Sequence, residues 1–341
     1  MLLKRESMER DVSIDIAKGI CIILVVIGHL LQFDCSGLAK NILFNYIYAF
    51  HMPVFMMLSG YVASYGKYDV TFTKLILRRF RQLMVPFLVW MVLTIVYWHT
   101  SLVGDITLAM SFLKRPDVGA WFLLSLFFIY LYFLLAKKIA KMLPVRNAMV
   151  SELITLVGML VLMLAIRACL KKSIFSDLCS WFYYLPDKYY VMFTFGYMVA
   201  KYKKSVIQNP FLLILSVVIF ALSIGRFHFS QSSALLQLTV SIPASILMIS
   251  LSSSIGLAFN GNVNWLMTFG KYSIVIYLVH LFFVHSLYGG AEFTAKLNTF
   301  CLAGLCLIFA IPICFLCVWI GKTMGAYPLL NELLFGKIRR K

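Results

Sequence analysis

Long apolar runs dominate this sequence and restrict the folds that are open to the chain. Runs of about 17 to 25 mostly apolar residues recur along the whole chain, and each is long enough to cross a hydrocarbon core about 30 Å thick. Because lipid offers no hydrogen bonds to peptide groups, such runs must be helices. Only 13% of the residues are charged, against roughly 25% in a soluble domain. The sequence therefore predicts an all-α integral membrane protein.

Ten of these runs are expected to form a bundle of transmembrane helices. They cover residues 13–31, 42–65, 83–102, 119–136, 149–169, 181–200, 211–225, 234–259, 265–287 and 297–320. The loops between them are too short to fold by themselves. Residues 1–341 are therefore expected to form a single membrane-embedded domain.

The distribution of the 31 lysines and arginines indicates the orientation of the chain in the membrane. With the N-terminus in the cytoplasm, more than two-thirds of them fall on the cytoplasmic side, mainly in the tracts 67–81, 137–146, 201–204 and 322–341. The positive-inside rule then predicts that both termini are cytoplasmic. Orientation and contact with anionic lipid account for the net charge of +18, so nucleic acid is not an expected partner.

The first run carries polar residues in the stretch "DIAKGICIILVVIGHLL", from Asp15 to Leu31. Eleven residues of helix turn through about 1100°, so Lys18 and His29 share one face and lie about 16 Å apart along the axis. Asp15 falls within about 40° of the same stripe. The run is thus expected to present a polar cytoplasmic end and one imidazole in its outer half.

Two more histidines are expected at a similar depth. His280 lies about fifteen residues into an outward-running helix and shares one face with Ser273 and Tyr277, while His51 lies in the outer half of an inward-running helix. Each imidazole fits either a hydrogen-bonded contact between helices or a general base near neutral pH. No carboxylate or cysteine recurs beside them at ligand spacing, so no metal site is expected.

The second run, "FHMPVFMMLSGYV", has a proline in its interior and two small residues further on. Pro53 is expected to free a backbone carbonyl of its helix. Ser59 and Gly60 permit either close helix packing or room for a thin ligand.

A cytoplasmic tract before the third run, "LRRFRQLMVP", contains Arg78, Arg79 and Arg81. The forked donors of arginine recognise phosphate, so the tract fits a phosphate-rich ligand. It fits equally well a topology signal that contacts lipid headgroups.

Two further candidates lie in other runs. Trp121, in "GAWFLLSL", is expected at the outer membrane interface, where tryptophan is a common anchor. Asp187, in "YYLPDKYY", either forms a neutralised pair with Lys188 or orients His29 as its carboxylate partner.

In these stretches the chain resembles the membrane acyltransferase family 3, multi-span O-acyltransferases that modify bacterial surface glycans, and within it the fucose-acetylase-like branch. The resemblance covers nearly the whole chain and rests on "DIAKGICIILVVIGH", "FHMPVFMMLSGYV", "RRFRQLMVP", "AWFLLSL" and "GKYSIVIYLVHLFF". Lys18 stands where the family typically has arginine, which keeps the charge but loses the forked geometry. Gln82 stands where the family often has a second arginine.

The resemblance implies that His29 is catalytic, that Arg79 and its neighbours help to hold an acetyl-CoA donor, and that Ser59 and Gly60 belong to the same channel. The expected site then has three groups. The catalytic group is His29, Asp187 and His280. The donor group is Lys18, Lys74, Arg78, Arg79, Arg81, Ser59 and Gly60, and the acceptor group is His51, Trp121 and Tyr277.

The expected function is that of a multi-pass O-acetyltransferase in the bacterial inner, or cytoplasmic, membrane. Acetyl-CoA would serve as cosubstrate, and the acceptor would be a sugar hydroxyl of a cell-surface polysaccharide, a glycolipid or a precursor. His29 would act as general base or transient acyl carrier. The expected partners are membrane lipids, the acyl-CoA and the glycan or glycolipid acceptor. The alternative is a transporter or flippase of glycoconjugates in which the histidines relay protons.

Overall fold

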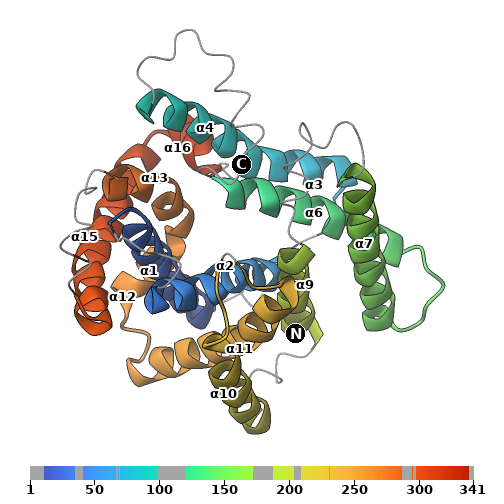
Figure 1. The fold of residues 1–341 in the computed structure, drawn as a ribbon. Coiled ribbons are helices and arrows are strands. Elements are labelled where there is room, and N and C mark those ends of the chain that lie inside the picture. The colour runs from blue at the N-terminus through green and yellow to red at the C-terminus, as the bar shows by residue number, and fades with distance from the viewer. Residues whose placement is uncertain are drawn as a thin grey trace, which may run out of the picture. The chain divides into compact units, whose positions relative to one another are not determined.

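The computed structural model of the protein describes residues 11–34, 41–66, 68, 70–98, 120–171, 187–202, 209–229, 231–285, 294 and 297–337. The regular structure of these residues is entirely helical, as the sequence predicts (Figure 1). They divide into two compact units, one of which holds the candidate histidines and the other the candidate arginines.

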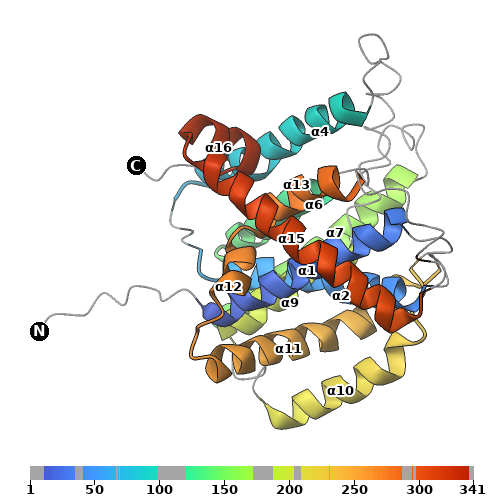
Figure 2. The same ribbon diagram turned by 90° about the vertical axis from the view of Figure 1, so that its left-hand side faces the viewer.

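The first unit surrounds the N-terminal helix. It contains α1 (Val12–Asp34), α2 (Ile42–Ala63) as far as Phe55, α10 (Pro210–Ile224), α12 (Asn264–Lys271), α13 (Ser273–His285), and most of α11 (Ala234–Ala258) and α15 (Thr299–Gly325). Helix α1 packs on α12 and α13, and α10 lies beside α11 (Figure 2). A buried cluster of Ala49, Ile224, Phe227 and Val240 holds α2 to α10 and α11.

Glycines bring α1 and α12 together backbone to backbone. A Cβ atom on Gly19 would lie 2.2 Å from the carbonyl oxygen of Leu266, and one on Gly270 would lie 1.9 Å from that of Asp15. Real Cβ atoms do not approach this closely, so any larger residue would push the two helices apart.

Pro53 frees a carbonyl of α2, as the sequence predicts. Proline has no N–H, so the carbonyl oxygen of Ala49, four residues earlier, loses its helical donor. The Oγ of Ser241 on α11 donates a hydrogen bond of 2.9 Å to this oxygen instead. The hydroxyl therefore fastens α2 to α11 at the point where the helix ladder is interrupted.

The second unit contains the remaining helices. These are α2 from Met56 onward, α3 (Phe72–Arg79), the π-helix η2 (Phe80–Met84), α4 (Val85–Trp98), α6 (Trp121–Ala140), α7 (Ala148–Lys171), α9 (Asp187–Tyr202) and α16 (Pro328–Phe335). Helix α6 packs on α7 and α9, and α16 packs on α4.

The π-helix η2 results from Pro86, the next proline in the chain after Pro53. Pro86 has no N–H for the carbonyl of Gln82, and the N–H of Val85 bonds five residues back, to Phe80. Gly336, which ends α16 with φ 64°, lies against the carbonyl oxygen of Gln82, and a Cβ atom there would be only 2.0 Å from it. The C-terminal end of α16 therefore packs directly on the backbone of the π-helix η2.

Six helices in the described part of the chain are long and apolar enough to cross a membrane: α1, α2, α6, α7, α11 and α15. The number becomes seven if the bent pair α12 and α13 forms one span. Helices α4, α9 and α10 match expected spans but have only 14, 16 and 15 residues. The total of ten spans, the single domain and the cytoplasmic termini stay predictions.

The expectation of one continuous helix over residues 265–287 is wrong. Helices α12 and α13 meet at an angle of 86°. Tyr272, between them, has the non-helical dihedrals φ −101° and ψ 14°. Gly270 packs on the backbone of α1, so a tertiary contact fixes the direction of α12 in a way that apolar composition does not reveal.

Candidate active site

Two of the three candidate histidines meet in the first unit. The ring centroids of His29 on α1 and His280 on α13 are 5.1 Å apart, and the ring planes are inclined by 47°. His280 is fully buried and His29 half-buried. The expectation that these two imidazoles share one depth is confirmed, although it was based on a straight helix over 265–287.

The tautomer of His29 follows from its neighbour. Its Nδ1 lies 3.1 Å from Oε1 of Gln32, and the same amide oxygen accepts a hydrogen bond of 3.1 Å from the hydroxyl of Tyr48. An amide oxygen can only accept, so Nδ1 of His29 carries the hydrogen and donates it. The other ring nitrogen, Nε2, is then left with a lone pair, as a general base requires.

His280 and His51 are oriented in the same way by carbonyls of their own helices. Nδ1 of His280 donates to the carbonyl oxygen of Ile276 at 2.8 Å, and Nδ1 of His51 donates to that of Ile47 at 2.6 Å. Nε2 of His280 is buried and has no hydrogen-bond partner among the described residues. The ring of Tyr277 lies 6.3 Å from that of His280, which confirms that these two share a helix face.

Tyr48 connects His51 to the other two histidines. Its ring meets that of His51 edge to face with centroids 4.9 Å apart, while its hydroxyl bonds to Gln32. The ring of Phe229 also packs on Tyr48, with centroids 4.7 Å apart. Among the described residues, no three His, Cys, Asp or Glu side chains gather closely enough to hold a metal ion. The site thus consists of imidazoles, one amide and aromatic rings.

The remaining first-unit candidate, Lys18, is half-buried on α1, one turn after the buried Asp15. The other candidates belong to the second unit. Asp187 begins α9, but its side chain lies outside the described part of the structure. Trp121 begins α6 and packs on Tyr189 with ring centroids 5.4 Å apart.

Gly60, also in the second unit, lies against α9. A Cβ atom there would be 1.8 Å from the carbonyl oxygen of Phe193. Ser59, beside it, is half-buried. The geometry at Gly60 fits close helix packing, the first of the two interpretations of this pair.

The arginines of the second unit do not converge on one point. Lys74 and Arg78 are exposed on α3. The guanidinium of Arg79 lies 4.0 Å above the ring of Tyr130, and its Nη1 donates to Oε1 of Gln82 at 3.0 Å. Arg81 forms a salt bridge with Glu332 on α16, in which its Nε donates at 2.7 Å. Gln82, where the family often has arginine, therefore serves as a partner for Arg79.

Sequence reasoning missed the residues that orient His29. Gln32 lies three residues after His29, a spacing at which side chains on a helix can touch, so that signal was present. Tyr48 gave no comparable signal, because it reaches Gln32 from a different helix.

The comparison with known proteins identifies the family of the chain. Residues 11–319 match the family described as an acyltransferase domain, so the chain belongs to this family, the acyltransferase family 3 that its motifs resemble. The family membership and the apolar helices together define a multi-pass membrane protein of the acyltransferase class.

Parts of the chain are also similar to two nodulation proteins NolL. The one from Sinorhizobium fredii (strain NBRC 101917 / NGR234) is 39% identical over 124 residues, which cover 33% of each chain. The one from Mesorhizobium japonicum (strain LMG 29417 / CECT 9101 / MAFF 303099) is 46% identical over 87 residues, or 24% of this chain and 23% of the relative. The chain thus spans a third or less of the curated relatives that it matches. No solved structure matches it.

Proposed function

We propose that this protein is an O-acetyltransferase of the bacterial cytoplasmic membrane. It moves an acetyl group from acetyl-CoA to a sugar hydroxyl of a cell-surface polysaccharide, a glycolipid or a precursor of these. The observation that carries the proposal is the hydrogen bond from Nδ1 of His29 to Gln32, which leaves Nε2 as the basic nitrogen. Membership of the acyltransferase family supports acyl transfer as the reaction.

In the proposed reaction, Nε2 of His29 takes the proton of the sugar hydroxyl while the hydroxyl oxygen attacks the thioester carbon. The new C–O bond forms, the C–S bond breaks, and the departing thiolate takes the proton back from the imidazolium. In a second route, Nε2 attacks the thioester carbon, the C–S bond breaks and the thiolate leaves. The sugar hydroxyl then attacks the acetyl carbon, the C–N bond to His29 breaks, and the hydroxyl proton passes to the thiolate. In both routes the ring gains positive charge, which the oxygen of Gln32 stabilises through Nδ1–H.

His280 is proposed to bind the acceptor. Its buried Nε2 has no partner in the described structure, and leaving such an acceptor unsatisfied costs about 1–3 kcal/mol. A sugar hydroxyl that donates to this nitrogen would remove the cost and lie beside His29, whose ring centroid is 5.1 Å from that of His280. His51, Tyr277 and Trp121 are proposed to contact the same acceptor, and Asp187 to assist His29.

The donor is proposed to bind through cationic residues and one small residue on α2: Lys18, Lys74, Arg78, Arg79, Arg81 and Ser59. Gly60, expected in the same group, packs on the backbone of α9 instead. Arg79→Ala is expected to raise the KM for acetyl-CoA roughly tenfold, because one charge-assisted hydrogen bond is lost. The KM for the acceptor should change little. Steady-state kinetics with each substrate varied in turn measures both constants, and equal losses would argue against a donor role.

Label transfer from acetyl-CoA to extracted glycans tests the function. Membranes carrying the protein should transfer labelled acetyl groups, and His29→Ala should lower the rate by about 10²–10⁴-fold, as expected for loss of a general base. His228→Ala is the matched control, because His228 is an exposed histidine in the turn between α10 and α11 and should not be needed. Glycan translocation without any acyl transfer would favour the transporter instead.

A further inference from the structure

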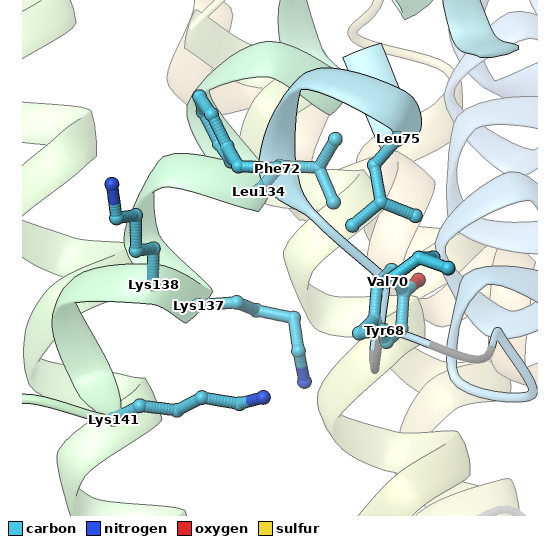
Figure 3. A pocket seen from close by; sticks show the side chains of 8 residues that line it. All are labelled: Tyr68, Val70, Phe72, Leu75, Leu134, Lys137, Lys138 and Lys141. Carbon is cyan, nitrogen blue, oxygen red and sulfur yellow. The ribbon is translucent and has the colours of Figure 1, made fainter.

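The second unit contains a cavity of about 190 Å³ between the start of α3 and the end of α6 (Figure 3). None of its lining residues belongs to the expected catalytic, donor or acceptor groups. One part of the wall is apolar or aromatic and the other is cationic. The wall consists of Tyr68, Val70, Phe72, Leu75, Leu134, Lys137, Lys138 and Lys141.

The three lysines line the cavity because of their spacing at the C-terminal end of α6, where Lys141 is the C-cap residue. Leu134, Lys137, Lys138 and Lys141 follow at i, i+3, i+4 and i+7, which places them on one helix face. In Figure 3, Lys137 and Lys141 extend toward Tyr68, whereas Lys138 points away. The positive-inside rule explains why lysines lie at the expected cytoplasmic end of this helix, but it does not require them to line a cavity.

The cavity has more positive than negative charge around it. Lys137, whose side chain is only 12% exposed, bonds to Oε1 of Glu152 at 3.0 Å and to the hydroxyl of Tyr197 at 2.6 Å. Lys201 bonds to the same carboxylate oxygen at 2.8 Å. One carboxylate thus serves two ammonium groups. In the described part of the chain, Lys138 and Lys141 have no carboxylate within salt-bridge distance.

The other wall adds no negative charge. Burial raises the pKa of Tyr68 above its usual range, so the phenol stays neutral, and its hydroxyl donates to the carbonyl oxygen of Ala63 at 2.6 Å. Helix α3 starts at Phe72, and its N-cap residue Thr71 makes no side-chain capping hydrogen bond. The partial positive charge of this helix start favours an anion in the cavity.

We propose that this cavity binds a phosphate group, with Lys137 and Lys141 as its main contacts. Its volume is below the roughly 300–1,000 Å³ that encloses a whole small molecule, so it takes the phosphate and the atoms next to it while the rest of the ligand extends outward. A phosphorylated nucleotide coenzyme and an anionic lipid headgroup both carry this chemistry. The binding site does not depend on the transferase reaction, because it needs neither the acceptor nor His29.

Binding to the full chain in lipid nanodiscs tests the proposal. Labelled coenzyme A is titrated into phosphatidylcholine nanodiscs, and in parallel the phosphatidylglycerol retained by the protein from mixed-lipid membranes is counted by mass spectrometry. The variants are Lys141→Gln and, as a control with the same loss of charge, Lys322→Gln at the exposed end of α15. Lys141→Arg keeps the charge and should keep the binding.

Lys141→Gln is expected to weaken the binding of one of the two ligands roughly tenfold. Lys322→Gln should change the affinity for the same ligand less than about twofold. Loss of coenzyme A binding shows that the phosphate group in the cavity belongs to a nucleotide. Loss of retained phosphatidylglycerol shows that it belongs to a lipid headgroup. The thermal transition of Lys141→Gln shows whether this variant is folded. If the folded variant binds coenzyme A and phosphatidylglycerol as the original protein does, the proposal is overturned. No acyl transfer is measured, so failure of the proposed function is a separate result.

Discussion

At the scale of single residues, the hydrogen bond of Nδ1 determines whether Nε2 of His29 can act as a base. Gln32 is exposed, and its amide oxygen accepts from both Nδ1 of His29 and the hydroxyl of Tyr48. Two donors on one oxygen hold the amide in place. Since an exposed side chain contributes little to folding, replacing it should affect the imidazole far more than stability.

Gln32→Leu is therefore expected to lower kcat roughly tenfold, the effect of losing one hydrogen bond that strengthens as the ring becomes charged. The KM for acetyl-CoA should hardly change, and Gln32→Glu, which still accepts from Nδ1, should retain most of the rate. Steady-state acetyl transfer by purified protein measures these constants. An unchanged kcat in Gln32→Leu would show that the amide does not position His29.

At the scale of the helices, glycines set how closely the elements pack. In the second unit a Cβ atom on Gly196 of α9 would lie 2.0 Å from the carbonyl oxygen of Met57 on α2, and Gly60 makes the reciprocal contact with α9. Backbone atoms cannot move aside as a flexible side chain can. Each substitution must therefore separate the two helices.

Gly196→Ala is expected to destabilise the protein by about 1–3 kcal/mol, the usual cost of overpacking a tight contact. Gly158→Ala on α7 is the matched control, because in the described part of the chain no atom beyond its chain neighbours and the adjacent backbone of α7 lies within 4 Å of the Cβ position. It should be neutral or slightly stabilising, since alanine favours helix over glycine by up to about 1 kcal/mol. Thermal unfolding in the same detergent compares the two, and equal transition temperatures would refute the packing argument.

At the scale of the whole molecule, the charge distribution predicts which loops face the cytoplasm. The exposed Cys169 and Cys301 lie at helix ends that the positive-inside rule places outside. Cys21, Cys306, Cys314 and Cys317 are buried. Thiol labelling can therefore read the orientation directly.

In a variant with Cys35 and Cys179 replaced by serine, an impermeant thiol reagent should label Cys169 and Cys301 in intact cells. A cysteine introduced by Arg146→Cys should gain label only after the membrane is opened, because the tract 137–146 is expected inside. Quantification by mass spectrometry gives the labelled fraction at each position. Labelling of Arg146→Cys in intact cells would contradict the predicted orientation.

Much of the local structure could be read from the sequence. Apolar runs located nine of the described helices to within several residues, namely α1, α2, α4, α6, α7, α9, α10, α11 and α15, but not α3 or α16. The rise per residue of a helix placed His29 and His280 at a similar depth. Pro53 correctly indicated a freed carbonyl, which Ser241 satisfies. These features are local: hydrophobicity, peptide hydrogen bonding and helix geometry act within about 25 residues of chain and need no knowledge of neighbours.

The remaining features depend on how the helices pack in three dimensions. The 86° bend at Tyr272, the bond from Tyr48 to Gln32 and the salt bridge of Arg81 with Glu332, 251 residues away, each depend on which helix packs on which. The lysine-lined cavity likewise needs α3 to lie opposite α6. The apolar runs are sufficient to predict that the chain forms membrane helices and that several of them contain histidine. Packing determined what each histidine and each charge touches, because that is set by residues far apart in the chain.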